Sequence, residues 1–128
     1  MGDERDHGGP RLNEGQEAVV ANDEGALLVL GVSGSGRTEA LARRLARLVE
    51  DGERALVLTR SVAAARRIRL RAEATIETGY EELGVHTHPV AAARLLREHA
   101  TEAEIDPSRI KRFESAELLR DHQRRVIR

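Results

Sequence analysis

The feature that most constrains the fold of this chain is a glycine-rich turn between an apolar run and an amphipathic segment. Residues 26–30 read ALLVL, and residues 31–38 read GVSGSGRT. A short apolar run without alternation is typical of a strand that is buried on both faces of a parallel sheet. Leucines then recur at helical spacing from 41 to 48, with arginines on the other side, up to Gly52. The pattern predicts a strand, a tight turn and a helix.

Apolar and amphipathic segments continue to alternate after this unit. Residues 55–59 and 84–87 predict two more strands, each followed by a helix, over residues 63–78 and 89–99. At the amino-terminal side, Asn13 and Gln16 match a capping box that opens a short helix to residue 21. Ser115 predicts the start of a last helix over 115–127. Alternating strands and helices indicate an α/β fold, a parallel sheet flanked by helices with right-handed crossovers.

Composition limits the class of protein. With 128 residues and 40% hydrophobic content, the chain can build one compact core. Residues 1–11 mix charge, glycine and proline without periodicity, so we expect a disordered leader before a folded part over 12–128. Cysteine is absent, which excludes disulfides and thiolate metal sites. We expect a cytoplasmic protein without membrane contact, because no signal peptide or long apolar run is present.

The charged and aromatic residues give weaker indications. The net charge is −1, and every basic residue except Lys111 is an arginine. Arginine binds phosphate with two parallel hydrogen bonds, which suits nucleic acid, but a GC-rich coding sequence would give the same excess. Tyr80 and Phe113 are the only aromatics, too few for a single-strand-binding barrel that stacks bases.

The glycine-rich turn fits the phosphate-binding pattern G-x-x-x-x-G-[KR]-T. Its glycines let backbone N–H groups approach a phosphate, and the helix that follows presents its positive end to the same anion. A purely steric glycine turn is the alternative interpretation. We therefore predict that this turn binds the phosphates, and that the hydroxyl of Thr38 binds Mg²⁺. The candidate phosphate-binding residues are Gly31, Ser33, Gly34, Ser35, Gly36, Arg37 and Thr38.

Arg37 stands where this pattern usually has a lysine. A guanidinium keeps the positive charge, but it is planar and bulkier than an ammonium group. It can attract a triphosphate and still fail to lie where charge develops during hydrolysis. A loss of about 3 kcal/mol of transition-state stabilisation would slow hydrolysis by roughly a hundredfold. We expect weakened or lost hydrolysis.

Together, Leu12, Asn13 and Gln16 followed by GSGRT resemble the L-N-x-x-Q and G-S-G-K-T motifs of UvrD/Rep-type superfamily 1 DNA helicases. The resemblance implies a RecA-like P-loop NTPase sheet with ATP and Mg²⁺ as cofactors. It also implies that the amide of Gln16 contacts the edge of adenine, a pairing that suits glutamine. An isolated N-x-x-Q would instead be a simple capping box.

The resemblance extends along the chain. Residues 59–65 are similar to the family's T-F-T-N-K-A-A segment, which touches single-stranded DNA, although Arg60 replaces the aromatic and Arg67 stands where an acid is usual. Residues 87–91 are similar to T-F-H-S-L, and residues 112–119 to I-L-D-S-x-x-x-L. An exposed Arg60 that only contacts solvent is the alternative. The resemblance marks four residues as DNA-binding: Thr59, Arg60, Thr87 and His88. A metal site at His86 and His88 is not expected, since acids at ligand spacing are lacking.

No apolar run of this sequence ends in the Asp-Glu pair that aligns Mg²⁺ and water for hydrolysis. In the family, that pair, the arginine finger and the second motor domain lie downstream of this segment. The sequence therefore predicts an ATP-binding segment of a helicase that binds ATP and single-stranded DNA weakly and cannot hydrolyse or unwind alone. It would need the remaining helicase domains or a partner motor subunit.

Two alternatives stay open. The chain could be a non-catalytic partner or regulatory module of a helicase–nuclease complex that retains only the P-loop fold. An unrelated P-loop enzyme, such as a small-molecule kinase, would need a second carboxylate site and a substrate lid, and neither is visible in the sequence. A motor domain without its neighbours exposes strand edges and apolar faces, so we expect self-association.

Overall fold

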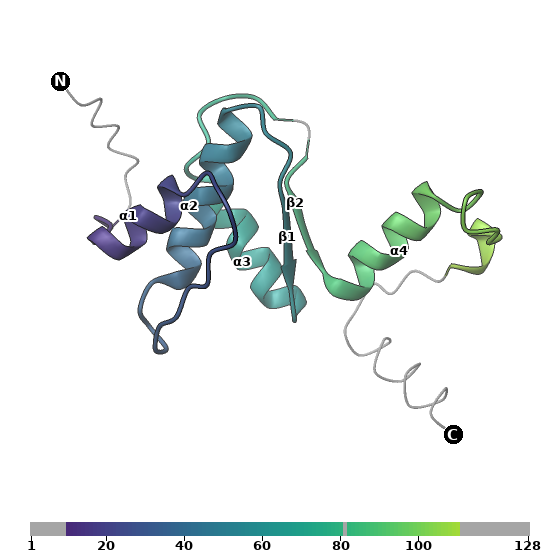
Figure 1. Ribbon diagram of the computed structural model, residues 1–128, viewed down its shortest axis with the longest axis horizontal. Helices are drawn as coiled ribbons and strands as arrows, with labels where there is room; N and C mark the ends of the chain where they lie inside the picture. Colours follow the sequence, from purple (N-terminus) through teal and green to yellow (C-terminus); the bar gives the residue numbers. More distant parts are fainter. Residues whose placement is uncertain (1–9, 81, 111–128) are drawn as a thin grey trace. The chain divides into compact units, whose positions relative to one another are not determined.

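The computed structural model describes residues 10–80 and 82–110 (Figure 1). These residues form a mixed helix and strand structure in which β1 and β2 pair as a small parallel sheet. Most of the leader and the predicted helix over 115–127 lie outside the described residues. The elements are α1 (Glu14–Ala21), α2 (Arg37–Glu50), β1 (Leu56–Thr59), α3 (Val62–Glu73), β2 (Gly84–Thr87), α4 (His88–Glu98) and a 3₁₀ turn, η1 (Pro107–Arg109).

The chain divides into two compact units. The first unit comprises Met1–Ala55 and Arg67–Gly84, and therefore holds α1, α2 and the second half of α3. The second unit comprises Leu56–Arg66 and Val85–Arg128, with the strand pair, the start of α3 and α4. None of the helices in the described residues is long and apolar enough to cross a bilayer.

The first unit is organised around the packing of α1 against α2 (Figure 1). The capping box predicted at the start of α1 is confirmed, because Asn13 and Gln16 exchange two hydrogen bonds of 2.9 Å. At the other end of α1, guanidinium groups of α2 donate to backbone oxygens: Arg44 to Val19 at 2.8 Å and Arg47 to Val20 at 2.9 Å. Carbonyl oxygens in the last turn of a helix have no hydrogen-bond donor within the helix, and the two arginines supply one here. Part of the arginine side predicted for α2 therefore lies against α1.

Alanine dominates the core of the first unit. The predicted amphipathic helix is confirmed as α2, and Leu45 is its largest fully buried side chain, with 2% of its surface exposed. Small side chains bury little apolar area, so we expect this core to contribute modestly to stability. The other buried apolar residues of the unit are Ala40, Ala42, Ala46, Ile68, Ala72 and Leu83.

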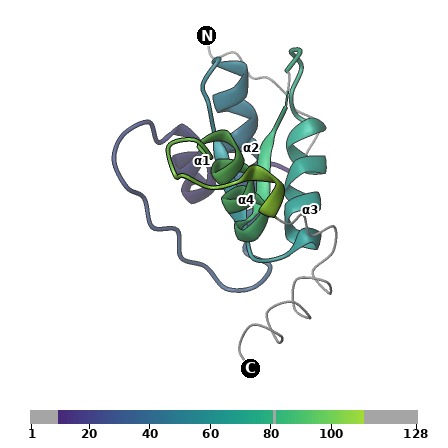
Figure 2. The same ribbon diagram turned by 90° about the vertical axis from the view of Figure 1, so that its right-hand side faces the viewer.

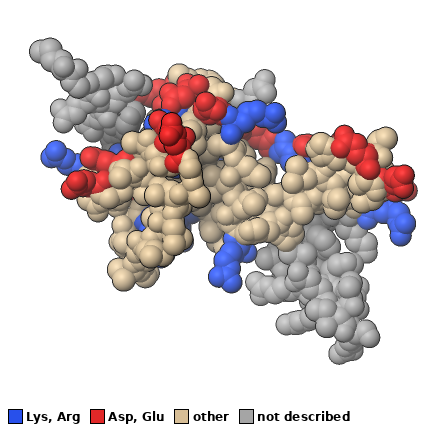
Figure 3. Space-filling view, in the orientation of Figure 1, with Lys and Arg blue, Asp and Glu red and all other residues tan. Residues whose placement is uncertain are grey.

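The predicted buried strand over residues 26–30 is wrong. In the structure this stretch is assigned to no strand, and Leu28 and Leu30 are each 81% exposed. Figure 2 shows the chain between α1 and α2 as a wide loop that stands away from both helices. The projection at the lower left of Figure 3, where Figure 1 places this loop, is almost entirely uncharged. An apolar run is buried only where neighbouring strands cover it, and the described sheet consists of β1 and β2 alone.

The second unit confirms the other two predicted strands. β1 and β2 lie side by side, and α4 packs against β1. Val85 of β2 and Ala91 of α4 are buried, with 1% and 6% exposure. Pro89 lies in the first turn of α4, where its missing N–H costs no hydrogen bond. The predicted helix over 89–99 is therefore confirmed as α4.

Helix α3 ends at Glu73, earlier than the predicted residue 78. The hydroxyl of Thr75 donates to the backbone oxygen of Arg71 at 3.0 Å, and the amide of Glu77 donates to the carboxylate of Glu50 at 2.9 Å. Hydrogen bonds to side chains of this kind compete with the hydrogen bonds that would continue the helix. The β-branched residues after Ala74 also have a low helix propensity. The alanine and arginine spacing predicted the helix but not its end.

Candidate functional site

The glycine-rich turn adopts a conformation that needs its glycines. Gly34 and Gly36 have φ angles of 82° and 78°, in the left-handed region where side chains are disfavoured. Gly36 is also the N-cap of α2, and no side chain caps that end of the helix. The first backbone N–H groups of α2 therefore have no side-chain acceptor, and they lie at the positive end of the helix dipole. This arrangement suits an anion.

Gln16 connects α1 to this turn. Its side-chain nitrogen donates to the backbone oxygen of Ser35 at 3.0 Å, while its side-chain oxygen accepts from the amide of Asn13 at 2.9 Å. A Cβ atom added at Gly36 would lie 2.2 Å from the Gln16 nitrogen, so the Gln16 side chain would have to move to admit it. Gln16 thus holds the turn in place, and both ends of its amide are used within the protein. Its predicted contact with adenine stays a prediction.

A cavity of about 670 Å³ lies between the glycine-rich turn and α3. The residues it takes from α3 and from the position directly after it follow the spacing i, i+3, i+4 and i+7, which places them on one side of that helix. Six of the predicted phosphate-binding residues line it, whereas Gly31 and Gln16 do not. The lining residues are Ser33, Gly34, Ser35, Gly36, Arg37, Thr38, Glu39, Arg67, Leu70, Arg71 and Ala74.

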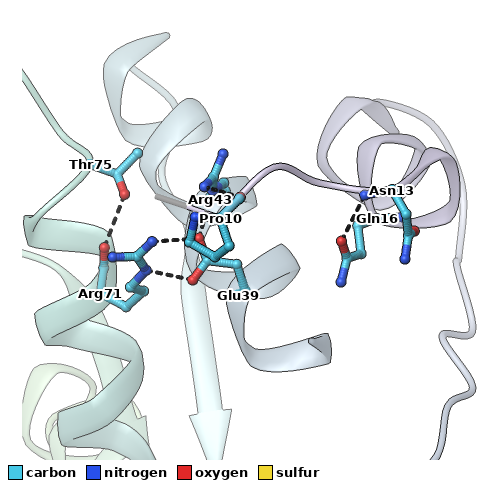
Figure 4. Close-up of polar contacts among 7 residues, drawn as sticks. All are labelled: Pro10, Asn13, Gln16, Glu39, Arg43, Arg71 and Thr75. Carbon is cyan, nitrogen blue, oxygen red and sulfur yellow. Dashed lines mark hydrogen bonds and ion pairs between the residues drawn. The ribbon is translucent and has the colours of Figure 1, made fainter. Parts of the chain in front are cut away.

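Glu39 of α2 is paired with two arginines, Arg43 on the same helix and Arg71 on α3 (Figure 4). Arg71 donates to both carboxylate oxygens, at 2.5 and 2.9 Å, and Arg43 donates to one of them at 2.7 Å. These hydrogen bonds, first of all those from Arg71, lower the pKa of Glu39 below its ordinary value of 4.5. The same contact raises the pKa of Arg71. The guanidinium of Arg71 is therefore already engaged inside the protein.

The other two arginines of the cavity are available. Arg37 and Arg67 are exposed, and neither makes a hydrogen bond or ion pair with any residue of 10–80 or 82–110. In the sequence, Arg67 stands out only as a departure from a family motif, and no motif marks Glu39 or Arg71 as site residues. The signal that could have found them is the four-residue spacing of Arg67 and Arg71, which places both on one face of α3.

The predicted DNA-binding residues gather in the second unit, at the ends of its two strands. Thr59 is buried, and its backbone oxygen lies 2.9 Å from Nδ1 of His88. Arg60 is exposed and makes no hydrogen bond or ion pair with a described residue, and Thr87 ends β2 directly before α4. Because parallel strands end at the same sheet edge, these four residues are neighbours. The burial of Thr59 leaves its side chain a structural role, since its hydroxyl donates to the oxygen of Ser61 at 3.0 Å.

The described residues contain no group of three or more His, Asp or Glu side chains that could hold a metal. His86 lies 3.3 Å from Arg94, and His88 contacts the backbone of Thr59. Both histidines therefore have protein partners. Thr38 lines the cavity with an exposed side chain, so its predicted contact with Mg²⁺ stays a prediction.

Comparison with known proteins agrees with the motifs. Residues 12–127 match the family of the UvrD/REP helicase N-terminal domain. The chain is 36% identical over 91 residues to the ATP-dependent DNA helicase PcrA of Leuconostoc citreum. It is 31% identical over 90 residues to the protein of the same name from Bacillus subtilis strain 168. Each match covers 67% of this chain but 12% of the relative, so the chain corresponds to a small part of either helicase.

Proposed function

Since the chain belongs to the UvrD/REP helicase N-terminal domain family, we propose that it binds ATP with Mg²⁺ at the glycine-rich turn, as part of a RecA-like P-loop domain. The observation that carries the proposal is the cavity between the turn and α3, where Arg37 and Arg67 have no ion-pair partner among the residues that the structure describes. The uncapped start of α2 offers backbone amides to a phosphate, and the left-handed glycines allow close approach.

Each side chain of the turn has a separate role in this proposal. Arg37 attracts the phosphates, and Thr38 offers its hydroxyl to Mg²⁺, which would neutralise charge on the phosphate oxygens. Gln16 fixes the turn through Ser35 in the absence of nucleotide. To contact adenine, Gln16 must first break one of two hydrogen bonds. One is from its side-chain nitrogen to the backbone oxygen of Ser35, and the other is from the amide of Asn13 to its side-chain oxygen.

We propose further that the chain does not turn ATP over by itself. None of its apolar segments ends in an Asp-Glu pair, and Arg37 places a guanidinium where charge would develop. Hydrolysis and unwinding would need the remaining helicase domains, which close on one another around ATP, or a partner motor subunit. The exposed apolar stretch at 26–30 supports this dependence, because a partner would cover it.

Weak binding of single-stranded DNA is the second part of the proposed function. The supporting observation is the shared sheet edge that brings together Thr59, Arg60, Thr87 and His88. Arg60 is exposed and has no ion-pair partner in residues 10–80 and 82–110, so it is proposed to contact a DNA phosphate. The contact would be sequence-independent and would weaken as salt increases.

Binding of a fluorescent ATP analogue with Mg²⁺ tests the proposal on the wild-type chain, Arg37→Lys and Arg37→Ala. Phosphate release is followed in parallel, with and without single-stranded DNA. Binding that Arg37→Ala weakens and Arg37→Lys preserves or strengthens, without phosphate release, is expected. Release stimulated by DNA in the wild-type chain would overturn the claim that it lacks turnover. Absence of binding in every variant would favour a partner module that keeps only the P-loop fold.

A further inference from the structure

We propose that Arg67 is a second phosphate-binding residue of this cavity, which together with Arg37 selects a nucleoside triphosphate over a diphosphate. The inference rests on the proposed nucleotide binding and adds a residue from α3 to it. Arg67 lies outside the glycine-rich motif in sequence, and it reaches the cavity only because α3 forms the other wall.

The electrostatic arrangement of the cavity supports this role. Its lining contains three arginines, Arg37, Arg67 and Arg71, and a single acidic residue, Glu39. Arg71 donates two hydrogen bonds to Glu39, so its guanidinium is already engaged. Arg37, at the end of the glycine-rich turn, and Arg67 of α3 make no ion pair within the described part of the chain. Two positive charges on separate walls match an extended, multiply charged polyphosphate better than a single phosphate group.

The pair of Glu39 and Arg71 also explains why Arg67 is the ligand on α3. Arg71 lies one turn further along the same helix face, but its guanidinium is turned toward Glu39 (Figure 4). Arg67 has no such partner among the described residues and is exposed. It can therefore move to a phosphate without breaking an existing ion pair, whereas Arg71 cannot.

The chain supplies a matched control for this hypothesis. Arg66 is the residue before Arg67 on α3, and it is also exposed without a partner among the described residues. Arg66 does not line the cavity, because neighbouring helix positions point to different sides. Substitution of either arginine by alanine removes the same charge from the chain. Only the loss of Arg67 should weaken triphosphate binding.

The experiment measures the affinity of fluorescent ATP and ADP analogues, with Mg²⁺, for the wild-type chain, Arg67→Ala and Arg66→Ala. We expect Arg67→Ala to weaken the ATP analogue about tenfold, the loss of one charge-assisted contact, and the ADP analogue much less. Arg66→Ala should leave both unchanged. Equal effects of the two substitutions, or an equal loss for ATP and ADP, would refute the role of Arg67.

Two further measurements separate this inference from neighbouring explanations. Binding of labelled single-stranded DNA should be the same for Arg67→Ala and Arg66→Ala, and a selective loss with Arg67→Ala would assign the residue to DNA phosphates instead. If the wild-type chain binds neither analogue, the proposed function itself fails. If the wild-type chain binds both and Arg67→Ala changes nothing, only the role of Arg67 fails. Circular dichroism of each variant checks that the helices are retained.

Discussion

Replacement of Glu39 by glutamine should destabilise the chain by about 2 kcal/mol. The carboxylate accepts three hydrogen bonds, two from Arg71 and one from Arg43, and the three side chains are 15%, 31% and 13% exposed. A buried charge-assisted hydrogen bond contributes about 1.5–3 kcal/mol, whereas an exposed ion pair contributes about 0–1 kcal/mol. Because the three side chains are partly exposed, we expect the contribution of the whole cluster to the free energy of unfolding to lie between these limits. Glutamine keeps the size of the side chain but removes its charge.

The assay is urea unfolding at neutral pH, followed by circular dichroism. A double-mutant cycle with Arg71→Leu isolates the pair, and we expect a coupling of about 1 kcal/mol. Glu53 provides the control, since it is exposed and its side chain has no partner in the described part of the chain. Glu53→Gln should leave stability within about 0.5 kcal/mol of the wild type. Coupling near zero would refute the reasoning that this cluster joins α2 to α3.

The same cluster predicts how stability depends on pH. Hydrogen bonding to Arg71 lowers the pKa of Glu39 in the folded state below 4.5, its ordinary value. The stabilisation is therefore complete above pH 4.5 and disappears as the pH falls through the lower, folded-state pKa. Unfolding measured across this acidic range should show the difference between wild type and Glu39→Gln shrinking toward zero. A difference that stays constant with pH would contradict the assignment to an ionised Glu39.

Three more substitutions test other parts of the structure. In urea unfolding, Gly36→Ala should lower the free energy of unfolding more than Gly34→Ala. Both positions have positive φ, which costs an alanine about 1–2 kcal/mol, but only at Gly36 would the new Cβ meet Gln16. Equal costs would contradict the close contact. Leu28→Lys should reduce self-association in sedimentation velocity, because this side chain is 81% exposed, and an unchanged sedimentation profile would show that the apolar stretch is not responsible. Asn13→Ala should lower the free energy of unfolding by about 1 kcal/mol through loss of the helix cap, and no loss would argue that the cap is dispensable.

Local signals in the sequence predicted most of the helices and two strands correctly. The capping box of α1, the leucine spacing of α2 and Pro89 at the start of α4 act within a few residues of where they stand. The strand predicted over 26–30 failed because its burial depends on neighbours at a distance. An apolar run shows that a segment can be buried, but it does not show what lies beside it.

One part of the candidate site could be predicted from local signals in the sequence, and the other part could not. The glycine-rich turn could be recognised from its spacing, and the structure places six of its residues around one cavity. The opposite wall could not be recognised, because helical spacing identifies the shared face of Arg67 and Arg71 but not the loop that this face meets. The interaction of Glu39 with Arg71 joins residues 32 positions apart, beyond the reach of any local pattern.

The loop between α1 and α2 contains two acidic residues, Asp23 and Glu24, but no basic residue, and this composition determines how proteases would cut the region. Exposed loops are preferred sites of cleavage, yet residues 12–36 contain no lysine or arginine, so the first bond there that trypsin can cut follows Arg37. Proteases that cut after small apolar residues would find several exposed bonds in 26–32. Trypsin would therefore report whether a ligand covers the phosphate-binding turn. A protease of the second kind would report whether a partner covers the apolar stretch.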